Sequence, residues 1–298
     1  MWGHHHGAMP VGVVDVGSNT VRLLVTRRGR PILSEREMLR LGADVEREGR
    51  IGDNKLARTA SVVGRYAEDA RAAGVNRLEV LITSPGRQAA NGERLAEAIE
   101  TAARCPVRIL SAAEEARLGF IGAVQAAAPP GRRRVAVVDV GGGSAQVAVG
   151  TRRDGPQWIR SIDIGSQRLT SRLLREDPPG KDDLESARAE VERQLDGFEP
   201  PQPRTAYAIG GSARAVKRIV GTSLGNDDLA MALSLLAATP AAELVRLFEI
   251  DEERTRTVAA GAVILAALQE RLGTPLRVVR GGLRDGALID LAARRAAA

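Results

Sequence analysis

A short segment occurs twice in this chain, and the repeat limits the folds open to it. The first copy, VGVVDVGSNTVRLLV, covers residues 11–25, and the second, VAVVDVGGGSAQVAV, covers residues 135–149. Each copy has an apolar β-branched run, an aspartate, a glycine-containing turn that ends in Thr or Ser, and a second apolar run. This pattern predicts two antiparallel strands joined by a tight turn. Two copies predict two related lobes with a cleft between them.

The two turns have the composition of a phosphate site. Glycine lets the backbone take a positive φ and brings its N–H groups close to a ligand. Successive N–H groups form a concave nest that suits phosphate oxygens, and hydroxyl groups add further donors. The residues predicted to bind phosphate here are Gly17, Ser18, Asn19, Thr20, Gly141, Gly142, Gly143 and Ser144.

Asp15 and Asp139 each end an apolar strand at the mouth of a turn. A carboxylate in that position is costly to desolvate unless it meets a cation, and Mg²⁺ held partly through water is the natural partner. We therefore predict both aspartates as Mg²⁺ ligands. A plain hairpin with a structural Asp-Gly turn would explain one copy equally well, but it explains two matched copies poorly.

Two further glycine-containing turns are weaker candidates. The segment DIGSQRLT at residues 163–170 lacks the preceding apolar run of the two repeats, so we interpret it as a strand-to-helix turn. Gly210 and Gly211 follow a predicted strand at residues 206–209 and open a predicted helix. A helix N-terminus binds anions readily, which makes both glycines candidate phosphate ligands. Close packing of strand on helix is an equally good explanation.

Between and after the repeats, helical and strand patterns alternate. Ser111 and Glu114 form a predicted capping box for one of the helices. Helices dominate after residue 170, and a proline-rich loop covers residues 199–203. Alternation of this kind predicts an α/β fold. The predicted helices are 51–73, 92–104 and 112–126, and the predicted strands are 77–83 and 107–110.

The histidines exclude several mechanisms. All three stand in the opening segment, as His4, His5 and His6, and we interpret residues 1–9 as the remnant of an affinity tag. The remaining chain has no histidine, which excludes Ser-His-Asp triads, Cys-His dyads and histidine-ligated zinc. No GxxxxGK segment followed by Ser or Thr occurs, so a Walker-type nucleotide hydrolase is excluded as well.

The amino-acid composition limits the classes of molecule that this chain is expected to bind. A net charge of +6 favours anionic ligands, whereas an aromatic content of 2% disfavours a base-stacking surface for nucleic acid. The longest apolar stretch is too short to span a membrane. Cys105 is the single cysteine, which fits a reducing cytoplasm. We expect a cytoplasmic protein with no membrane and no specific nucleic-acid partner.

Five motifs, taken together and in this order, resemble the exopolyphosphatase / guanosine pentaphosphate phosphatase (Ppx/GppA) family of the actin-like ATPase superfamily. The resemblance implies two ribonuclease H-like lobes that enclose a phosphate-binding cleft. It places domain I at residues 10–117 plus 284–298 and domain II at residues 118–283, in the short form that lacks a C-terminal histidine-aspartate domain. The motifs are DVGSNTVRL from Asp15, TSPGR from Thr83 with Asn91, EEARL from Glu114, DVGGGS from Asp139, and GLRDG from Gly282.

The resemblance also assigns roles. It implies that Glu115 is the general base that activates water and that Arg87 holds a phosphate. Arg22, which follows the first turn, is a further candidate phosphate ligand, with a solvated arginine as an equal alternative. Where the family usually has a metal-binding glutamate, this chain has Gln146, a weaker Mg²⁺ ligand.

Ser144 and Gln146 are expected to share a strand face, so Gln146 is assigned to the metal shell beside Asp139. An open cleft would hydrate a new charge there, so Gln146→Glu is expected to change stability little.

The leading hypothesis is an Mg²⁺-dependent exopolyphosphatase that removes terminal phosphate from inorganic polyphosphate. One alternative is a guanosine pentaphosphate 5'-phosphohydrolase, which would connect the protein with the stringent response. Another is a catalytically weak polyphosphate or nucleotide sensor, made so by Gln146. A sugar kinase of the same superfamily is disfavoured by the EEARL motif. A homodimer remains open.

Overall fold

The computed structural model describes residues 9–296. The interpreted tag remnant lies outside the described residues except for Met9. The chain divides into two compact units. The first unit runs to Leu110 and resumes at Ala287, and the second unit is Ser111–Gly286.

The first unit contains a five-stranded sheet in the order β3-β2-β1-β4-β5. β1 and β2 form the predicted antiparallel hairpin, with Asp15 opposite Arg22, and β3 extends it in the antiparallel sense. β4 runs parallel to β1, and β5 runs parallel to β4. The strands are β1 (Val11–Val16), β2 (Thr20–Arg27), β3 (Arg30–Met38), β4 (Arg77–Ile82) and β5 (Val107–Ile109).

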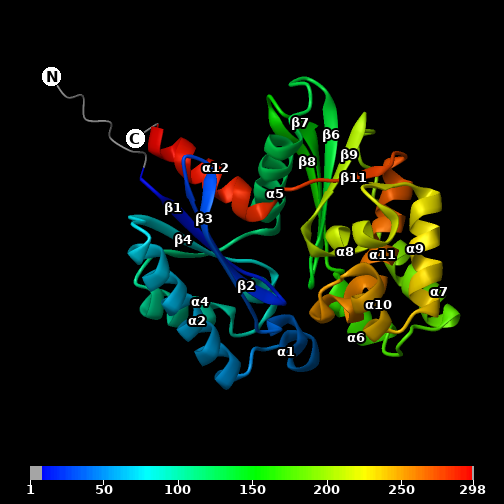
Figure 1. Ribbon diagram of the computed structural model, residues 1–298, viewed down its shortest axis with the longest axis horizontal. Coiled ribbons are helices and arrows are strands. Elements are labelled where there is room, and N and C mark those ends of the chain that lie inside the picture. Colours follow the sequence, from blue (N-terminus) through cyan, green and yellow to red (C-terminus); the bar gives the residue numbers. More distant parts are fainter. Residues whose placement is uncertain (1–8, 297–298) are drawn as a thin grey trace. The chain divides into compact units, whose positions relative to one another are not determined.

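Helices α2 and α4 pack together over one face of this sheet (Figure 1). The apolar side chains of α2 recur at helical spacing, as Leu56, Val63 and Ala70, and are buried in the core of the unit. A salt bridge between Arg294 of α12 and the buried Glu79 of β4 joins α12 to the sheet. The helices are α1 (Leu41–Glu48), α2 (Asp53–Ala72), α3 (Ser84–Gln88), α4 (Gly92–Ala103) and α12 (Leu283–Ala296), whose first turn belongs to the second unit.

The second unit repeats this topology. Its sheet has the order β10-β11-β9-β6-β7-β8. β6, β7 and β8 are antiparallel neighbours, β9 runs parallel to β6, and β11 runs parallel to β9. Apart from β10, order and direction match those of the first sheet, so the predicted fold of two ribonuclease H-like lobes is confirmed. The strands are β6 (Arg134–Val140), β7 (Ala145–Thr151), β8 (Gly155–Ile162), β9 (Thr205–Ile209), β10 (Ser223–Leu224) and β11 (Leu276–Val278).

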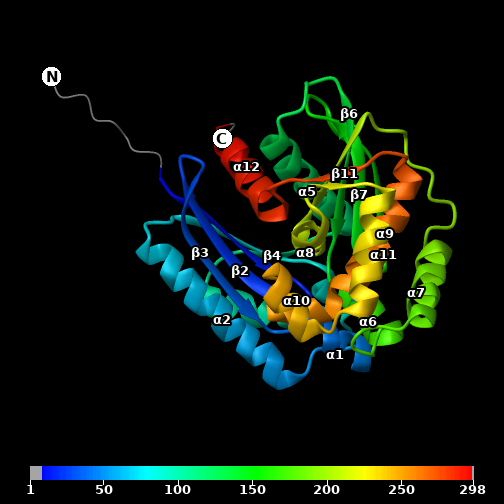
Figure 2. The ribbon, with the colours of Figure 1, turned by 45° about the vertical axis from the view of Figure 1, so that its right-hand side comes forward.

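Helix α5 covers one face of the second sheet, and α8 and α11 cover the other. Figure 2 shows α7 and α9 gathered around α11. No helix in the described part of the chain is both long and apolar enough to cross a membrane. The helices are α5 (Ala112–Ala127), α6 (Ser166–Leu173), α7 (Lys181–Gln194), α8 (Gly210–Val220), α9 (Asn226–Ala238), α10 (Ala241–Phe248) and α11 (Glu252–Leu272).

The interpretation of residues 163–170 as a strand-to-helix turn is confirmed, because β8 ends directly before Asp163 and α6 begins at Ser166, although no strand was predicted for residues 155–162. β8 lies at the edge of its sheet and pairs only with β7, so polar residues such as Arg160 reach solvent and break the apolar pattern. The expectation of one strand after residue 170 is also incomplete. β10 and β11 are two and three residues long, too short to show a pattern.

The start of α12 packs against α5 at backbone distance. A Cβ atom on Gly122 would collide with the carbonyl of Gly282, and a Cβ atom on Gly286 would collide with the carbonyl of Leu118. Close helix packing therefore explains Gly122 and Gly286, the second glycine of the GLRDG motif.

We predict that Gly122→Ala lowers the free energy of unfolding by about 1–3 kcal/mol, because the backbone of α12 has to move to admit the methyl group. Urea unfolding measures the change. Gly131→Ala is the control, since a Cβ atom there meets nothing within 4 Å, and we expect a change below about 0.5 kcal/mol. Equal stability of the two variants would contradict the close packing.

Candidate active site

The two predicted turns close with the same backbone hydrogen bond. Gly17 N donates to Thr20 O at 3.0 Å, and Gly141 N donates to Ser144 O at 3.0 Å. The expectation that these glycines take a positive φ is wrong, because neither has one. Glycine is needed for close approach instead: a Cβ atom would lie 3.3 Å from Thr20 O in the first turn and 3.0 Å from Ser144 O in the second.

Helix α1 and the segment before it bind the carbonyl groups of the first turn. Gly42 N donates to Ser18 O at 2.8 Å, and Leu39 N donates to Asn19 O at 2.9 Å. In a trans peptide the C=O and the following N–H point in opposite directions. The N–H groups of Asn19 and Thr20 therefore point away from α1, which is the orientation a phosphate nest requires.

The other predicted residues of the first unit lie around this turn. Ser18 Oγ is 2.7 Å from Ser84 Oγ, so the turn contacts the start of α3. Asp15 and Arg22 are half-buried and face each other across the hairpin. From α3, Arg87 Nη1 donates to Leu110 O at 2.8 Å. Phosphate binding by Arg22 and Arg87 stays a prediction.

Helix α6 binds the second turn from behind in the same way. Ser166 N donates to Gly141 O at 2.9 Å, and Gln167 N donates to Gly142 O at 3.0 Å. The N-terminal amides of α6 therefore bind the second turn. This is the structural role of the DIGSQRLT segment at residues 163–170. By the geometry of the trans peptide, the N–H groups of Gly142 and Gly143 point away from α6.

Asp139 lies where β6, β9 and α5 meet. Gly210 has a φ of 85°, and a Cβ atom there would collide with Asp139 Oδ1. A Cβ atom on Gly119 of α5 would lie 4.0 Å from Asp139 Oδ2. Glu115 precedes Gly119 by four residues, so the two share one face of α5. The predicted general base therefore lies on the helix face that looks toward the predicted metal ligand.

The N-terminus of α5 separates the roles of its two adjacent glutamates. Glu114 N donates to Ser111 Oγ at 3.2 Å, and Ser111 N donates to Glu114 Oε2 at 2.9 Å. The predicted capping box is thereby confirmed, and a cap of this kind contributes about 1 kcal/mol. Glu114 is committed to the cap, whereas Glu115 is half-buried one residue further on.

Two arginines near the second turn were not found from the sequence. The guanidinium of Arg254 lies against Gly211, at the point where α8 begins. Arg214 has solvent-exposed surface. Desolvation by the surrounding protein nevertheless lowers its pKa below the ordinary value. The negative charges of Asp139, Asp285 and Asp251 oppose this shift. Arg214 follows Gly211 by three residues. A spacing of three residues is close to one helical turn, so it places Arg214 near the start of α8. This spacing is the sequence signal that could have identified Arg214.

Gln146 is buried, with 3% of its surface exposed. Gln146 is the register partner of Asp139 in the β6–β7 pair. The equivalent position in the first hairpin is Arg22, the register partner of Asp15. Gln146 Nε2 donates to Ser144 Oγ at 2.8 Å, which confirms that Gln146 and Ser144 share a face. The expectation of an open, hydrated surrounding is wrong, because the side chain is enclosed and hydrogen-bonded.

The donor groups fit a hard cation with few protein ligands. Among the described residues, no three His, Cys, Asp or Glu side chains come together as a metal cluster. In the first unit, the buried Asn19 Oδ1 has no hydrogen-bond partner within the part of the chain that is described. Mg²⁺ commonly uses one or two carboxylates, several waters and phosphate oxygens. Asp15 and Asp139 are donors of that kind.

Comparison with known proteins shows to which family the chain belongs. The sequence model described as the Ppx/GppA phosphatase family matches residues 25–295. The chain belongs to the Ppx/GppA phosphatase family. It is therefore an enzyme of the phosphoanhydride hydrolase type.

Individual members are similar over almost the whole chain. Exopolyphosphatase 1 of Mycobacterium leprae is 26% identical over 94% of this chain and 89% of its own length. Exopolyphosphatase 2 of Mycobacterium tuberculosis is 27% identical over 95% of this chain and 98% of its own. The crystal structure of the Aquifex aeolicus Ppx/GppA family member has the same fold, with a TM-score of 0.82 at 23% identity, over 96% of this chain and 98% of that one.

We predict that Gln146→Glu lowers stability by about 1–3 kcal/mol at neutral pH without metal, because it buries a second carboxylate opposite Asp139. Burial raises the pKa of the new carboxyl group, so stability should recover as the pH falls and the group is protonated. Mg²⁺ should restore stability at neutral pH if position 146 lies in the metal shell. Thermal unfolding with and without Mg²⁺ measures both effects.

Gln157→Glu, on the exposed side of β8, is the matched control for the added charge. An Mg²⁺ response that is the same in both variants would exclude Gln146 from the metal shell.

Proposed function

We propose that this member of the family is an Mg²⁺-dependent exopolyphosphatase, which removes the terminal phosphate from inorganic polyphosphate. The observation that carries the proposal is that Glu115 lies on the face of α5 that Gly119 turns toward Asp139. Glu115 shares a face of α5 with Gly119, and the missing side chain of Gly119 leaves room for the Asp139 carboxylate. A carboxylate base beside a metal-binding carboxylate suits phosphoanhydride hydrolysis, which needs an oriented water and charge neutralisation.

The proposed reaction uses this chain's groups for binding and proton transfer. Glu115 orients a water molecule and accepts its proton while the water oxygen bonds to the terminal phosphorus. The bond from that phosphorus to the bridging oxygen breaks. Orthophosphate leaves, and the remaining chain is one phosphate shorter. The outward N–H groups of Gly142 and Gly143 are oriented to hold phosphate oxygens as negative charge builds up.

In this proposal Asp139 holds Mg²⁺ in the second unit, and the bound ion neutralises phosphate charge. Asp15 and the side-chain oxygen Oδ1 of Asn19 offer a comparable donor set in the first unit. Gln146 contributes through Ser144: its amide N–H fills a lone pair of that hydroxyl, so the hydroxyl hydrogen can point to a phosphate oxygen.

The choice of substrate is part of the proposal. The printed names of the mycobacterial relatives, Exopolyphosphatase 1 and 2, support polyphosphate, and so does an aromatic content of 2%, which offers little for stacking a purine. A cytoplasmic location is proposed from the free Cys105, since free thiols persist in a reducing compartment.

The experiment that tests the proposal measures phosphate release from polyphosphate and from guanosine pentaphosphate side by side, with Mg²⁺ and with EDTA. Release from polyphosphate that EDTA abolishes supports the proposal. Faster phosphate release from guanosine pentaphosphate would show that this compound, and not polyphosphate, is the preferred substrate. Binding of either compound without release would make the protein a sensor, as the neutral side chain of Gln146 opposite Asp139 would favour.

We predict that Glu115→Gln lowers the rate of polyphosphate hydrolysis at least about 100-fold, equivalent to about 2.7 kcal/mol in the barrier, because an amide cannot accept the proton. Polyphosphate binding and the unfolding temperature should change little. Steady-state phosphate release and equilibrium binding measure the two effects.

Glu114→Gln is the matched control, because its amide oxygen can still accept the hydrogen bond from Ser111 N. We expect it to retain activity within about threefold, as for a residue outside the chemical step. Full activity of Glu115→Gln, or an equal loss in both variants, would rule out Glu115 as the base.

A further inference from the structure

The first turn depends on a short segment that carries none of the predicted site residues. The amides of Leu39, Arg40 and Gly42 donate to the carbonyls of Ser18 and Asn19, at 2.9, 3.0 and 2.8 Å. These bonds fix the direction of the turn's peptide planes. Any change in the backbone of residues 39–42 would therefore reorient the N–H groups that point the opposite way.

This segment contains a backbone conformation that requires outside support. Arg40 is the N-cap residue of α1 and has φ 51° and ψ 47°, in the left-handed region. A residue with a Cβ atom is disfavoured there unless surrounding contacts hold it. Its own side chain makes no capping bond. Its carbonyl oxygen accepts a bond from Ala43 N of α1 at 3.2 Å, and further support comes from outside this segment.

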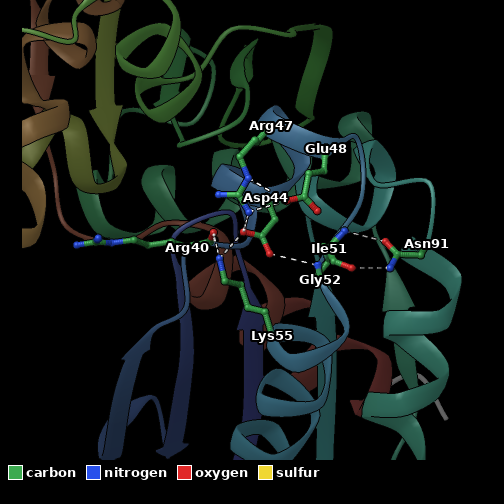
Figure 3. A network of polar contacts seen from close by, with 8 residues as sticks. All are labelled: Arg40, Asp44, Arg47, Glu48, Ile51, Gly52, Lys55 and Asn91. Carbon is green, nitrogen blue, oxygen red and sulfur yellow. Dashed lines mark hydrogen bonds and ion pairs between the residues drawn. The ribbon is translucent and has the colours of Figure 1, made fainter.

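Lys55 of α2 supplies the support. Its Nζ donates to the carbonyl of Arg40 at 3.2 Å and to Asp44 Oδ1 at 2.6 Å (Figure 3). The ammonium group thus joins the left-handed peptide to a carboxylate one turn further along α1. Lys55 is one of only three lysines in a chain that otherwise uses arginine. Its ammonium group has three N–H donors, enough to reach both acceptors at once.

Asp44 holds Lys55 in place. It is buried, and Asp44 Oδ2 accepts a bond from Gly52 N at 3.2 Å. Burial by itself would raise the pKa of Asp44. The bonds from Lys55 and Gly52 and the charges of Lys55 and Arg47 outweigh that effect, so its pKa lies below the ordinary value. The carboxylate is therefore ionised at neutral pH.

A second connection returns from this cluster to the turn. Asn91 exchanges two hydrogen bonds with the backbone of Ile51, the neighbour of Gly52, at 2.8 and 2.9 Å (Figure 3). Asn91 lies shortly after α3, and α3 begins at Ser84, which contacts Ser18. The cluster and the turn are thus linked through α1 on one side and through α3 on the other.

We propose that Asp44 and Lys55 are positioning residues for the first phosphate turn. Lys55 holds the Arg40 peptide in the left-handed conformation from which the amides of residues 39–42 orient the turn, and Asp44 holds Lys55. The inference rests on the proposed function for its kinetic consequence, but its structural part can be measured without any substrate.

The test compares Lys55→Met, Lys55→Arg and Arg108→Met. Lys55→Met removes the ammonium group, and Lys55→Arg tests rescue by a longer cation. Arg108→Met is the matched control, because Arg108 pairs with another buried carboxylate of the same unit, Glu79, at 2.9 Å. This ion pair lies on β4 and β5, outside α1 and the first turn. Asp44→Asn is a milder variant that keeps an acceptor for Gly52 N if Lys55→Met does not fold.

The first readout is hydrogen exchange at the amides of residues 39, 40 and 42. We expect Lys55→Met to lose at least about tenfold of their protection, and Arg108→Met to retain it. The second readout is kinetic. We expect Lys55→Met to raise KM for polyphosphate at least about fivefold with kcat within about twofold, Lys55→Arg to restore most of the difference, and Arg108→Met to leave KM unchanged.

Unchanged amide protection in Lys55→Met, or an equal loss in Arg108→Met, would overturn the inference. Equal changes of KM in both variants would do the same, since they would show a general loss of stability. A wild-type protein that releases phosphate from neither substrate would refute the proposed function alone, because the exchange measurement still decides the structural role.

Discussion

A single backbone hydrogen bond, from the glycine after a strand to the hydroxyl residue three positions later, organises each half of this protein. It occurs from Gly17 to Thr20 and from Gly141 to Ser144 at the same 3.0 Å. It reverses the chain within four residues, which forces the second strand to pair antiparallel with the first. It also turns the carbonyls of the turn to one side, where α1 or α6 binds them, and so turns the N–H groups to the other. The antiparallel pairing of each hairpin and the orientation of the N–H groups in its turn follow from the same constraint.

Much of the fold could be predicted because its signals are local. The two hairpins, α2, α4 and the capping box of α5 are each written in a stretch of continuous sequence. The strands that were missed have no such signal. β8 is an edge strand with polar residues on its open side, and β10 and β11 exist only because β9 offers neighbouring positions for pairing.

The site divides in the same way. Asp15 and Asp139 could be selected as candidates because a carboxylate at the end of a buried strand is unusual, and Gly210 because it follows a predicted strand. The conformation of the turn glycines was mistaken, since close approach and positive φ both demand glycine and the sequence does not distinguish them. Arg254 and the Asp44–Lys55 cluster join segments from different elements. No local pattern marks such contacts, so they needed the tertiary structure.

The second unit is inserted into the first, and this affects the order in which the protein can be completed during synthesis. The chain leaves the first unit after Leu110 and returns at Ala287. Of the two arginines that the described residues bring to Glu79, Arg108 is made early, whereas Arg294 lies 215 residues beyond Glu79 in the sequence. The inserted unit is continuous and can form its sheet on the ribosome while the first unit still lacks its last helix. Until α12 has been made, Glu79 of the nascent first unit has Arg108 but not Arg294 as an ion-pair partner.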